Sequence, residues 1–216
     1  MAKKIGILGG TFDPVHIGHL RSAIEVLESC GLDEVRLIPG AVPPHRATPQ
    51  VGAQQRLDMV RLAVEGVPGL SVDDRELRRE GPSWTIDTLL SLRQELPADT
   101  QLYFILGQDA FAGLPKWHRW QEILQHCHLL VLQRPQMPVE LPAGLRQLLQ
   151  QSRVPGAADM QGGSGQIALL EQTPLPVSAT GIRQARADGQ DISFLVPDRV
   201  RDYIQHHGLY TVIHSI

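Results

Sequence analysis

Residues 5–19 read IGILGGTFDPVHIGH, and this stretch decides the fold. The apolar run 5–8 has the length of a buried strand, and the paired glycines that follow it predict a turn. Apolar residues at helical spacing predict a helix over about 16–29. A strand, a glycine turn and a helix in this order begin a βαβ unit, in which the sheet is parallel.

The rest of the chain alternates in the same way. Further apolar runs predict strands at residues 35–39, 70–73, 101–106, 128–132 and 166–170. Helical periodicity predicts helices around residues 57–64 and over about 85–96, 145–150, 179–187 and 197–206. We therefore expect an α/β fold: a Rossmann-like, doubly wound parallel sheet with helices on both faces.

Residue types at the helix ends and in one charged segment predict local structure. Ser83 or Thr85 is expected to cap the helix over 85–96, because both side chains can accept a hydrogen bond from a free backbone N–H. Pro197 is expected to take the first position of the last helix. The charged run 73–80 mixes both signs and predicts a solvated loop.

The composition of the 216 residues is that of a globular protein. Hydrophobic residues make up 42% and charged residues 20%, and the net charge of −3 argues against bulk binding of nucleic acid. The apolar runs are too short for a membrane span, and two cysteines cannot form a disulfide framework, so we expect a cytoplasmic protein. We expect one domain over 1–216 with a C-terminal helical subdomain at about 174–216; a boundary near Arg134 is the alternative. An assembly of identical chains is left open.

The first candidate site lies at the start of the first helix, where free backbone N–H groups and the helix dipole favour an anion. His16 and His19 share one helix face, and Gly18 leaves space between them. Two imidazoles can donate hydrogen bonds to phosphate oxygens and stabilise the charge that develops in phosphoryl transfer. A pair of exposed histidines without a ligand is the alternative. The residues predicted to form this first phosphate seat are Gly9, Gly10, Thr11, Phe12, His16 and His19.

A second candidate site opens the helix over 179–187. Residues 176–183 read PVSATGIR, which places hydroxyl groups and free N–H groups at a helix start, with an arginine one turn later. This pattern predicts a second phosphate seat, formed by Ser178, Thr180 and Arg183. A capping serine beside a solvated arginine is the alternative.

A third group of residues suits a heteroaromatic acceptor. Asp109, after a buried strand, is placed to hold ribose hydroxyls, with a helix cap as the alternative. Trp117 and Trp120 have flat faces that suit a cationic ring, and core packing is the alternative for one of them. The helix start at Trp84 and Thr85 suits a carboxylate. The other residues expected on this edge of the sheet are His45, Arg46, Gly107 and Arg134, the last with a surface arginine as the alternative.

Together these motifs resemble a known family. The HIGH of residues 16–19 is similar to the mark of the nucleotidylyltransferase superfamily, and residues 176–183 are similar to its I-S-S-T-x-x-R signature. Val177 and Ala179 depart from that signature, so a phosphate contact at position 179 must use the backbone N–H. With the further motifs PPHR, GPSWTIDTL and GQDAF, the chain resembles the bacterial nicotinate-nucleotide adenylyltransferases over nearly its whole length.

The resemblance implies adenylyl transfer from ATP to nicotinate mononucleotide, with Mg²⁺ as cofactor and nicotinate adenine dinucleotide and pyrophosphate as products. It implies that the first and second phosphate seats, with Gly107 and Asp109, bind ATP. It also implies that Trp117 stacks on the pyridine ring, that Thr85 takes the carboxylate, and that Asp109 holds a ribose.

Catalysis is assigned to His16, His19 and Arg183, with in-line attack of the acceptor phosphate on the α-phosphorus as the hypothesis. The alternatives are another acceptor, such as nicotinamide mononucleotide or phosphopantetheine, and a nucleotide-binding regulator without catalysis. A metal site held by the protein is not predicted at residues 126–128, which read HCH, because neighbouring strand residues point to opposite faces.

Overall fold

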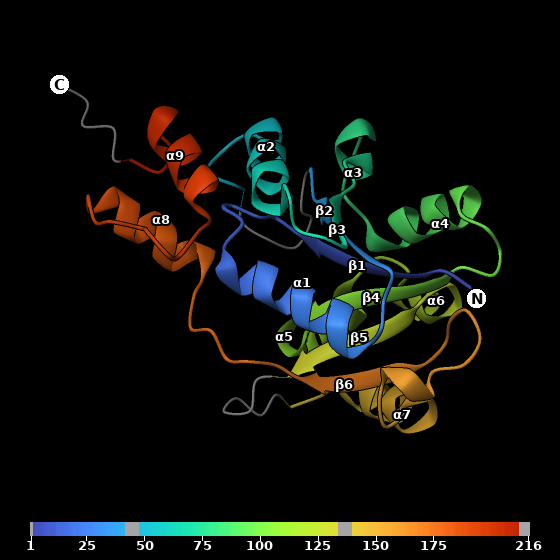
Figure 1. The fold of residues 1–216 in the computed structure, drawn as a ribbon. Coiled ribbons are helices and arrows are strands. Elements are labelled where there is room, and N and C mark those ends of the chain that lie inside the picture. Colours follow the sequence, from blue (N-terminus) through green and yellow to red (C-terminus); the bar gives the residue numbers. More distant parts are fainter. Residues whose placement is uncertain (1, 42–47, 134–139, 212–216) are drawn as a thin grey trace.

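The computed structural model describes residues 2–41, 48–133 and 140–211. A six-stranded sheet in the order β3-β2-β1-β4-β5-β6 runs through the described residues, and each pair of neighbouring strands is parallel (Figure 1). The strands are β1 (Lys4–Gly10), β2 (Glu34–Pro39), β3 (Leu70–Val72), β4 (Gln101–Gly107), β5 (His128–Gln133) and β6 (Ile167–Glu171). The helices are α1 (Ile17–Ser29), α2 (Ala53–Val64), α3 (Arg75–Arg78), α4 (Thr85–Glu95), α5 (Gln108–Ala112), α6 (Trp120–His126), α7 (Ala143–Ser152), α8 (Ala179–Ala187) and α9 (Asp198–His206), with 3-10 turns η1 (Leu114–Lys116) and η2 (Ala157–Asp159).

The strand order reverses between β1 and β4, which are neighbours in the centre of the sheet. The chain winds outward from β1 to β3 on one side and from β4 to β6 on the other, so the prediction of a doubly wound parallel sheet is confirmed. Sheets of this kind bind ligands at the carboxyl ends of the strands beside the reversal. Here those ends are Gly10 of β1 and Gly107 of β4, both of which belong to the predicted sites.

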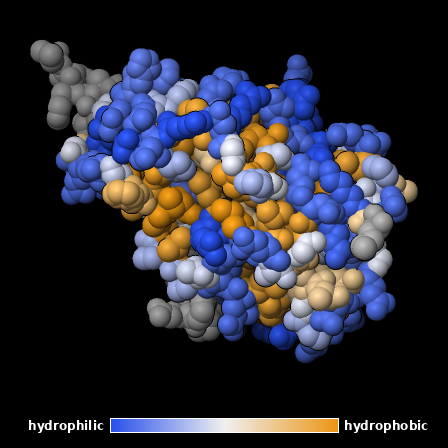
Figure 2. Space-filling model, in the orientation of Figure 1, coloured by the Kyte–Doolittle hydropathy of each residue, from blue (hydrophilic) through white to orange (hydrophobic). Residues whose placement is uncertain are grey.

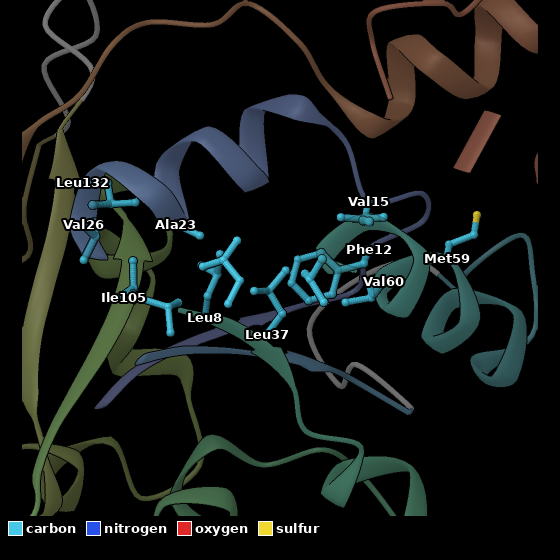
Figure 3. Close-up of a cluster of buried hydrophobic side chains, with 14 of the residues drawn as sticks. Leu8, Phe12, Val15, Ala23, Val26, Leu37, Met59, Val60, Ile105 and Leu132 are labelled. Carbon is cyan, nitrogen blue, oxygen red and sulfur yellow. The ribbon is translucent and has the colours of Figure 1, made fainter. Parts of the chain in front are cut away.

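Apolar side chains of the strands alternate between two clusters, one on each face of the sheet. In β4, Tyr103 and Ile105 belong to the first cluster, and Leu102 and Phe104 belong to the second. Helices α1, α2, α8 and α9 contribute to the first cluster, and α4, α6 and α7 contribute to the second. Figure 3 shows part of the first cluster, with side chains of β1, β2, β4 and β5 gathered beside those of α1 and α2.

The surface seen in Figure 2 has hydrophobic residues across its middle, where α1 lies in front of the sheet, and hydrophilic residues around them. Within the part of the chain that the structure describes, none of the helices has the length and apolar character needed to cross a membrane.

The predictions for the first residues of α4 and α9 are wrong. Trp84, whose indole cannot accept a hydrogen bond, takes the cap position of α4. The hydroxyl of Ser83 instead accepts a hydrogen bond from the backbone N–H of Ala41 at 2.9 Å, so this serine joins two loops. Pro197 takes the cap position of α9, and the helix begins one residue later.

The prediction of a solvated loop over residues 73–80 is also wrong. Asp73 is buried, and its carboxylate accepts a hydrogen bond from Nε of Arg75 at 2.8 Å. Arg75 also donates to Ser91 and Glu95 of α4, at 2.9 and 2.8 Å. The mixed charges of this segment pair with one another and with a neighbouring helix, which the sequence of the segment alone does not show.

The helices α5 and α6 were not predicted. Both helices are short. The residue before α6, Arg119, has a φ of 51° in the left-handed region, so the backbone is not helical there and α6 begins only at Trp120. The helix predicted over 145–150 is longer in the structure, where α7 spans Ala143–Ser152.

Candidate active site

The loop between β1 and α1 is anchored by a buried phenylalanine. Phe12 is 2% exposed and belongs to the first core cluster together with Val15 (Figure 3). A Cβ atom at Gly10 would lie 2.9 Å from the Phe12 ring, so the ring can cover position 10 only because that residue is glycine. The structure therefore places the Phe12 side chain in the core, where it supports the loop.

His16 and His19 lie against each other at the start of α1. Their ring centroids are 3.7 Å apart and their planes differ by 27°. The backbone N–H of His16 donates to Nδ1 of His19 at 3.3 Å, so the proton of a neutral His19 lies on Nε2. The structure thus brings the two predicted histidines together, with His19 in the tautomer that can donate from Nε2.

His16 is the buried member of the pair, with 6% of its surface exposed. Burial lowers the pKa of its imidazole to about 4, so the ring is neutral at pH 7. Two buried polar atoms of the first phosphate seat, Nδ1 of His16 and Oγ1 of Thr11, have no hydrogen-bond partner among the described residues. Such atoms are strong candidates to bind a polar ligand, because leaving them unpaired costs free energy.

The second phosphate seat lies beside the first. Ser178 caps α8 by accepting a hydrogen bond from the N–H of Gly181 at 3.1 Å. Nη2 of Arg183 donates to Oγ1 of Thr180 at 3.3 Å, and its Nη1 donates to the backbone carbonyl of Asp13 at 2.7 Å. Residues 170 positions apart thereby join the two helix starts at one place. Both helix starts can direct N–H groups and positive dipole ends to the same polyanion.

A buried arginine that the sequence did not predict supports the backbone of the first phosphate seat. Arg56 of α2 is 1% exposed, and its guanidinium donates to three backbone carbonyls: that of Thr11 at 2.6 Å, that of Gly40 at 2.7 Å and that of Ala41 at 3.1 Å. The signal was present in the sequence, because Arg56 lies within the apolar stripe of α2, where a charged residue needs a partner.

The acceptor residues gather around the start of α4. The ring of Trp84 lies 4.9 Å from that of His118, and the ring of Trp117 meets Phe104 of β4 edge-on at 6.0 Å. Trp117 and Trp120 are both half-buried and pack against the second core cluster. Thr85 is half-buried at the first position of α4. The segment with the tryptophans and the start of α4 therefore face each other.

The remaining predicted residues lie at the carboxyl end of β4 or outside the described chain. Gly107 ends β4 and Asp109 lies one residue into α5, and both are exposed. His45, Arg46 and Arg134 lie outside the described residues.

The HCH segment spans the junction of α6 and β5: His126 ends the helix, Cys127 caps it and His128 begins the strand. Cys127 is fully buried, and burial raises the pKa of its thiol to about 12. His128 is also buried, with Nε2 at 3.2 Å from the carbonyl of Gly162. Across residues 2–41, 48–133 and 140–211, His, Cys, Asp and Glu side chains do not come together in a group of three that could hold a metal ion.

The chain is similar to known proteins over nearly its full length. Residues 7–185 match the cytidylyltransferase-like family. The chain is 62% identical over 210 residues to a probable nicotinate-nucleotide adenylyltransferase of Pseudomonas fluorescens, covering 97% of this chain and 98% of that protein. It is 56% identical over 214 residues to a protein of the same name from Pseudomonas aeruginosa, covering 99% and 100%.

The fold is similar to that of a Plasmodium falciparum nicotinic acid mononucleotide adenylyltransferase solved in complex with NaAD. The TM-score is 0.74, and the match covers 96% of this chain and 97% of the other at 16% sequence identity. At this identity the likeness concerns the fold.

Gly18→Ala is expected to impair the first phosphate seat while leaving the helix intact. The added Cβ would lie 3.0 Å from Nδ1 and Cε1 of His16, so the ring must move, although alanine favours a helix by up to about 1 kcal/mol. We expect catalytic turnover to fall by about tenfold or more, since small displacements of catalytic groups have effects of this size. The control is Gly144→Ala, at the second position of α7, where an added Cβ meets nothing within 4 Å. Equal turnover in the two variants would contradict this role of Gly18.

The low pKa of His16 predicts a pH dependence of stability. The unfolded imidazole binds a proton below about pH 6.5, whereas the folded one binds it only near pH 4. Stability should therefore fall as the pH falls through this window. Between pH 7.5 and 5, urea unfolding should show the wild type losing about 2 kcal/mol more than His16→Asn, which cannot take up this proton. Equal losses would show that His16 is not buried in the neutral form.

Proposed function

The chain belongs to the cytidylyltransferase-like family and, within it, to the nicotinate-nucleotide adenylyltransferases, and from this membership we propose that it transfers the adenylyl group of ATP to nicotinate mononucleotide. The products are nicotinate adenine dinucleotide and pyrophosphate. The observation that supports this proposal best is the junction of the two phosphate seats, where Arg183 of α8 donates to the carbonyl of Asp13 at 2.7 Å. A triphosphate is long enough and charged enough to occupy both helix starts at once.

The proposed reaction is an in-line displacement. The acceptor phosphate attacks the α-phosphorus of ATP, the new P–O bond forms, and the bond to the leaving pyrophosphate breaks. An acceptor phosphate is already ionised at neutral pH, so a general base is not required. His16 and His19 donate hydrogen bonds to the oxygens that gain charge in the transition state.

The leaving pyrophosphate is assigned to the second phosphate seat. This seat contains Ser178, Thr180 and the free N–H groups at the start of α8, and Arg183 extends from it to the carbonyl of Asp13. The guanidinium can therefore stabilise the negative charge that develops on the β-phosphate. Mg²⁺ bound with the triphosphate would neutralise phosphate charge.

The acceptor is assigned to the start of α4 and the tryptophan segment that faces it. Thr85 and the first N–H groups of α4 suit a carboxylate, Trp117 offers a flat face for the pyridine ring, and Asp109 suits the ribose hydroxyls. His45, Arg46 and Arg134, which lie outside the described residues, are proposed as further acceptor contacts. We also propose that residues 1–216 act as one domain, because α8 completes the site that begins at β1.

The test measures pyrophosphate release from ATP and Mg²⁺ with nicotinate mononucleotide, nicotinamide mononucleotide or phosphopantetheine supplied separately. Fast turnover with the nicotinate acceptor alone is expected. His19→Ala should lower turnover by about 10² or more, the usual cost of losing a transition-state donor. His206→Ala, which changes an exposed histidine at the end of α9, is the matched control and should leave turnover unchanged.

Other outcomes would redirect the assignment. Preference for another acceptor would keep the phosphate chemistry and remove the roles of Trp117 and Thr85. ATP binding without turnover of any acceptor would favour a nucleotide-binding regulator.

Thr85 is expected to contribute to the choice of acid over amide. A site built for a carboxylate leaves hydrogen-bond donors poorly paired when an amide binds. Removal of one donor should therefore reduce the preference for the nicotinate over the nicotinamide nucleotide. Thr85→Val keeps the shape of the side chain and removes the hydroxyl. The ratio of kcat/KM for the nicotinate and nicotinamide nucleotides should fall by about fivefold or more. The control is Thr173→Val, near Glu25 of α1 on the other face of the sheet, which should leave this ratio unchanged. An unchanged ratio for Thr85→Val would contradict the role of Thr85.

A further inference from the structure

The C-terminal part of the described chain reaches the first phosphate seat. Tyr210 follows α9 and is 7% exposed, and its hydroxyl donates to Oδ1 of Asp13 at 2.8 Å. The two residues are 197 positions apart. In Figure 1, α8 and α9 lie together beside the end of β1 and the start of α1, which makes this contact possible.

Asp13 connects three segments. Its Oδ1 accepts from Tyr210, its Oδ2 accepts from the backbone N–H of Gln50 at 2.9 Å, and its backbone carbonyl accepts from Nη1 of Arg183 at 2.7 Å. The same Nη1 lies 3.9 Å from Oδ2. A shift of the Asp13 side chain would therefore change the charge beside the Arg183 guanidinium. It would also disturb the residue whose backbone carbonyl accepts from that guanidinium.

Tyr210 is suited to hold Asp13 in place. The hydroxyl is buried and faces a carboxylate, and both conditions raise the pKa of the phenol, so it keeps its proton and acts as a donor. A hydrogen bond to a charged acceptor in a buried place is stronger than one at the surface. The backbone of Tyr210 has a φ of 60°, an uncommon conformation for a residue with a side chain, and its buried contacts hold it there.

We propose that Tyr210 is a positioning residue of the adenylyl-transfer site: through Asp13 it fixes Arg183 in the place where that guanidinium meets the leaving pyrophosphate. This inference rests on the proposed function only in the assignment of pyrophosphate to Arg183. It makes Tyr210, which follows α9, a residue that acts on the active site through Asp13 and does not itself touch the phosphate.

Tyr210→Phe tests the inference, because it removes the hydroxyl and keeps the ring that packs in the core. The matched control is Tyr203→Phe, since Tyr203 of α9 also donates to an aspartate, Oδ2 of Asp58 of α2, at 3.3 Å. We expect kcat to fall about tenfold in Tyr210→Phe, with KM for the nicotinate acceptor changed less than about twofold. Tyr203→Phe should keep both constants.

The Arg183→Ala background shows whether the effect passes through Arg183. There, Tyr210→Phe should cause a much smaller further loss of kcat than it causes in the wild type, because the group that it positions has been removed. A full, additive loss would overturn the inference. So would a Tyr210→Phe protein that melts at lower temperature but keeps its kcat at 25 °C, since that result belongs to a purely structural tyrosine.

Calorimetric titration with inorganic pyrophosphate separates this inference from the proposed function. Tyr210→Phe should bind pyrophosphate about fivefold more weakly than Tyr203→Phe. A wild type that turns over none of the acceptors would contradict the proposed function, and the titration would still decide the role of Tyr210. Equal pyrophosphate affinities in the two variants would overturn the inference.

Discussion

Two arginines from distant helices donate to backbone carbonyls of the loop between β1 and α1, and the rest of the site depends on these hydrogen bonds. Arg56 reaches Thr11 from α2, and Arg183 reaches Asp13 from α8. A loop that turns its N–H groups toward an anion must leave carbonyls on its other side, and buried carbonyls need donors. The guanidinium groups supply those donors and also carry the positive charge that a polyanion requires.

Arg56 also connects the loop between β1 and α1 to the segment before α4. Besides Thr11 it holds the carbonyl of Ala41, and the N–H of Ala41 donates to Ser83 just before α4. Near α4, the carboxylate of Glu76 accepts a hydrogen bond from Thr88 at 2.6 Å, and burial raises its pKa. The hydrogen bonds of Arg56 and Ser83 thus connect the loop between β1 and α1 to the start of α4. They fix the distance between the sites that we propose for the triphosphate and for the acceptor carboxylate.

The sequence predicted the sheet and the helices α1 and α8 that open at the two candidate phosphate seats, because strand periodicity, the glycine turn and helix periodicity are local signals. It did not predict the contacts that hold the seats together. Nothing near Tyr210 indicates a partner 197 positions away, and Ser83 has the residue type of a cap although it bonds to Ala41. Arg56 is intermediate: its place in an apolar stripe shows that it needs a partner but not which one. The roles of His16, His19 and the acceptor residues stay predictions.

The central claim is that one ligand occupies both phosphate seats. A crystal structure of the protein with nicotinate adenine dinucleotide and pyrophosphate tests it most directly. The account predicts phosphate groups between the starts of α1 and α8, within hydrogen-bond distance of His19 and Arg183, and the pyridine ring against Trp117. Phosphates bound at only one helix start, with Arg183 still directed only at Asp13 and Thr180, would contradict it.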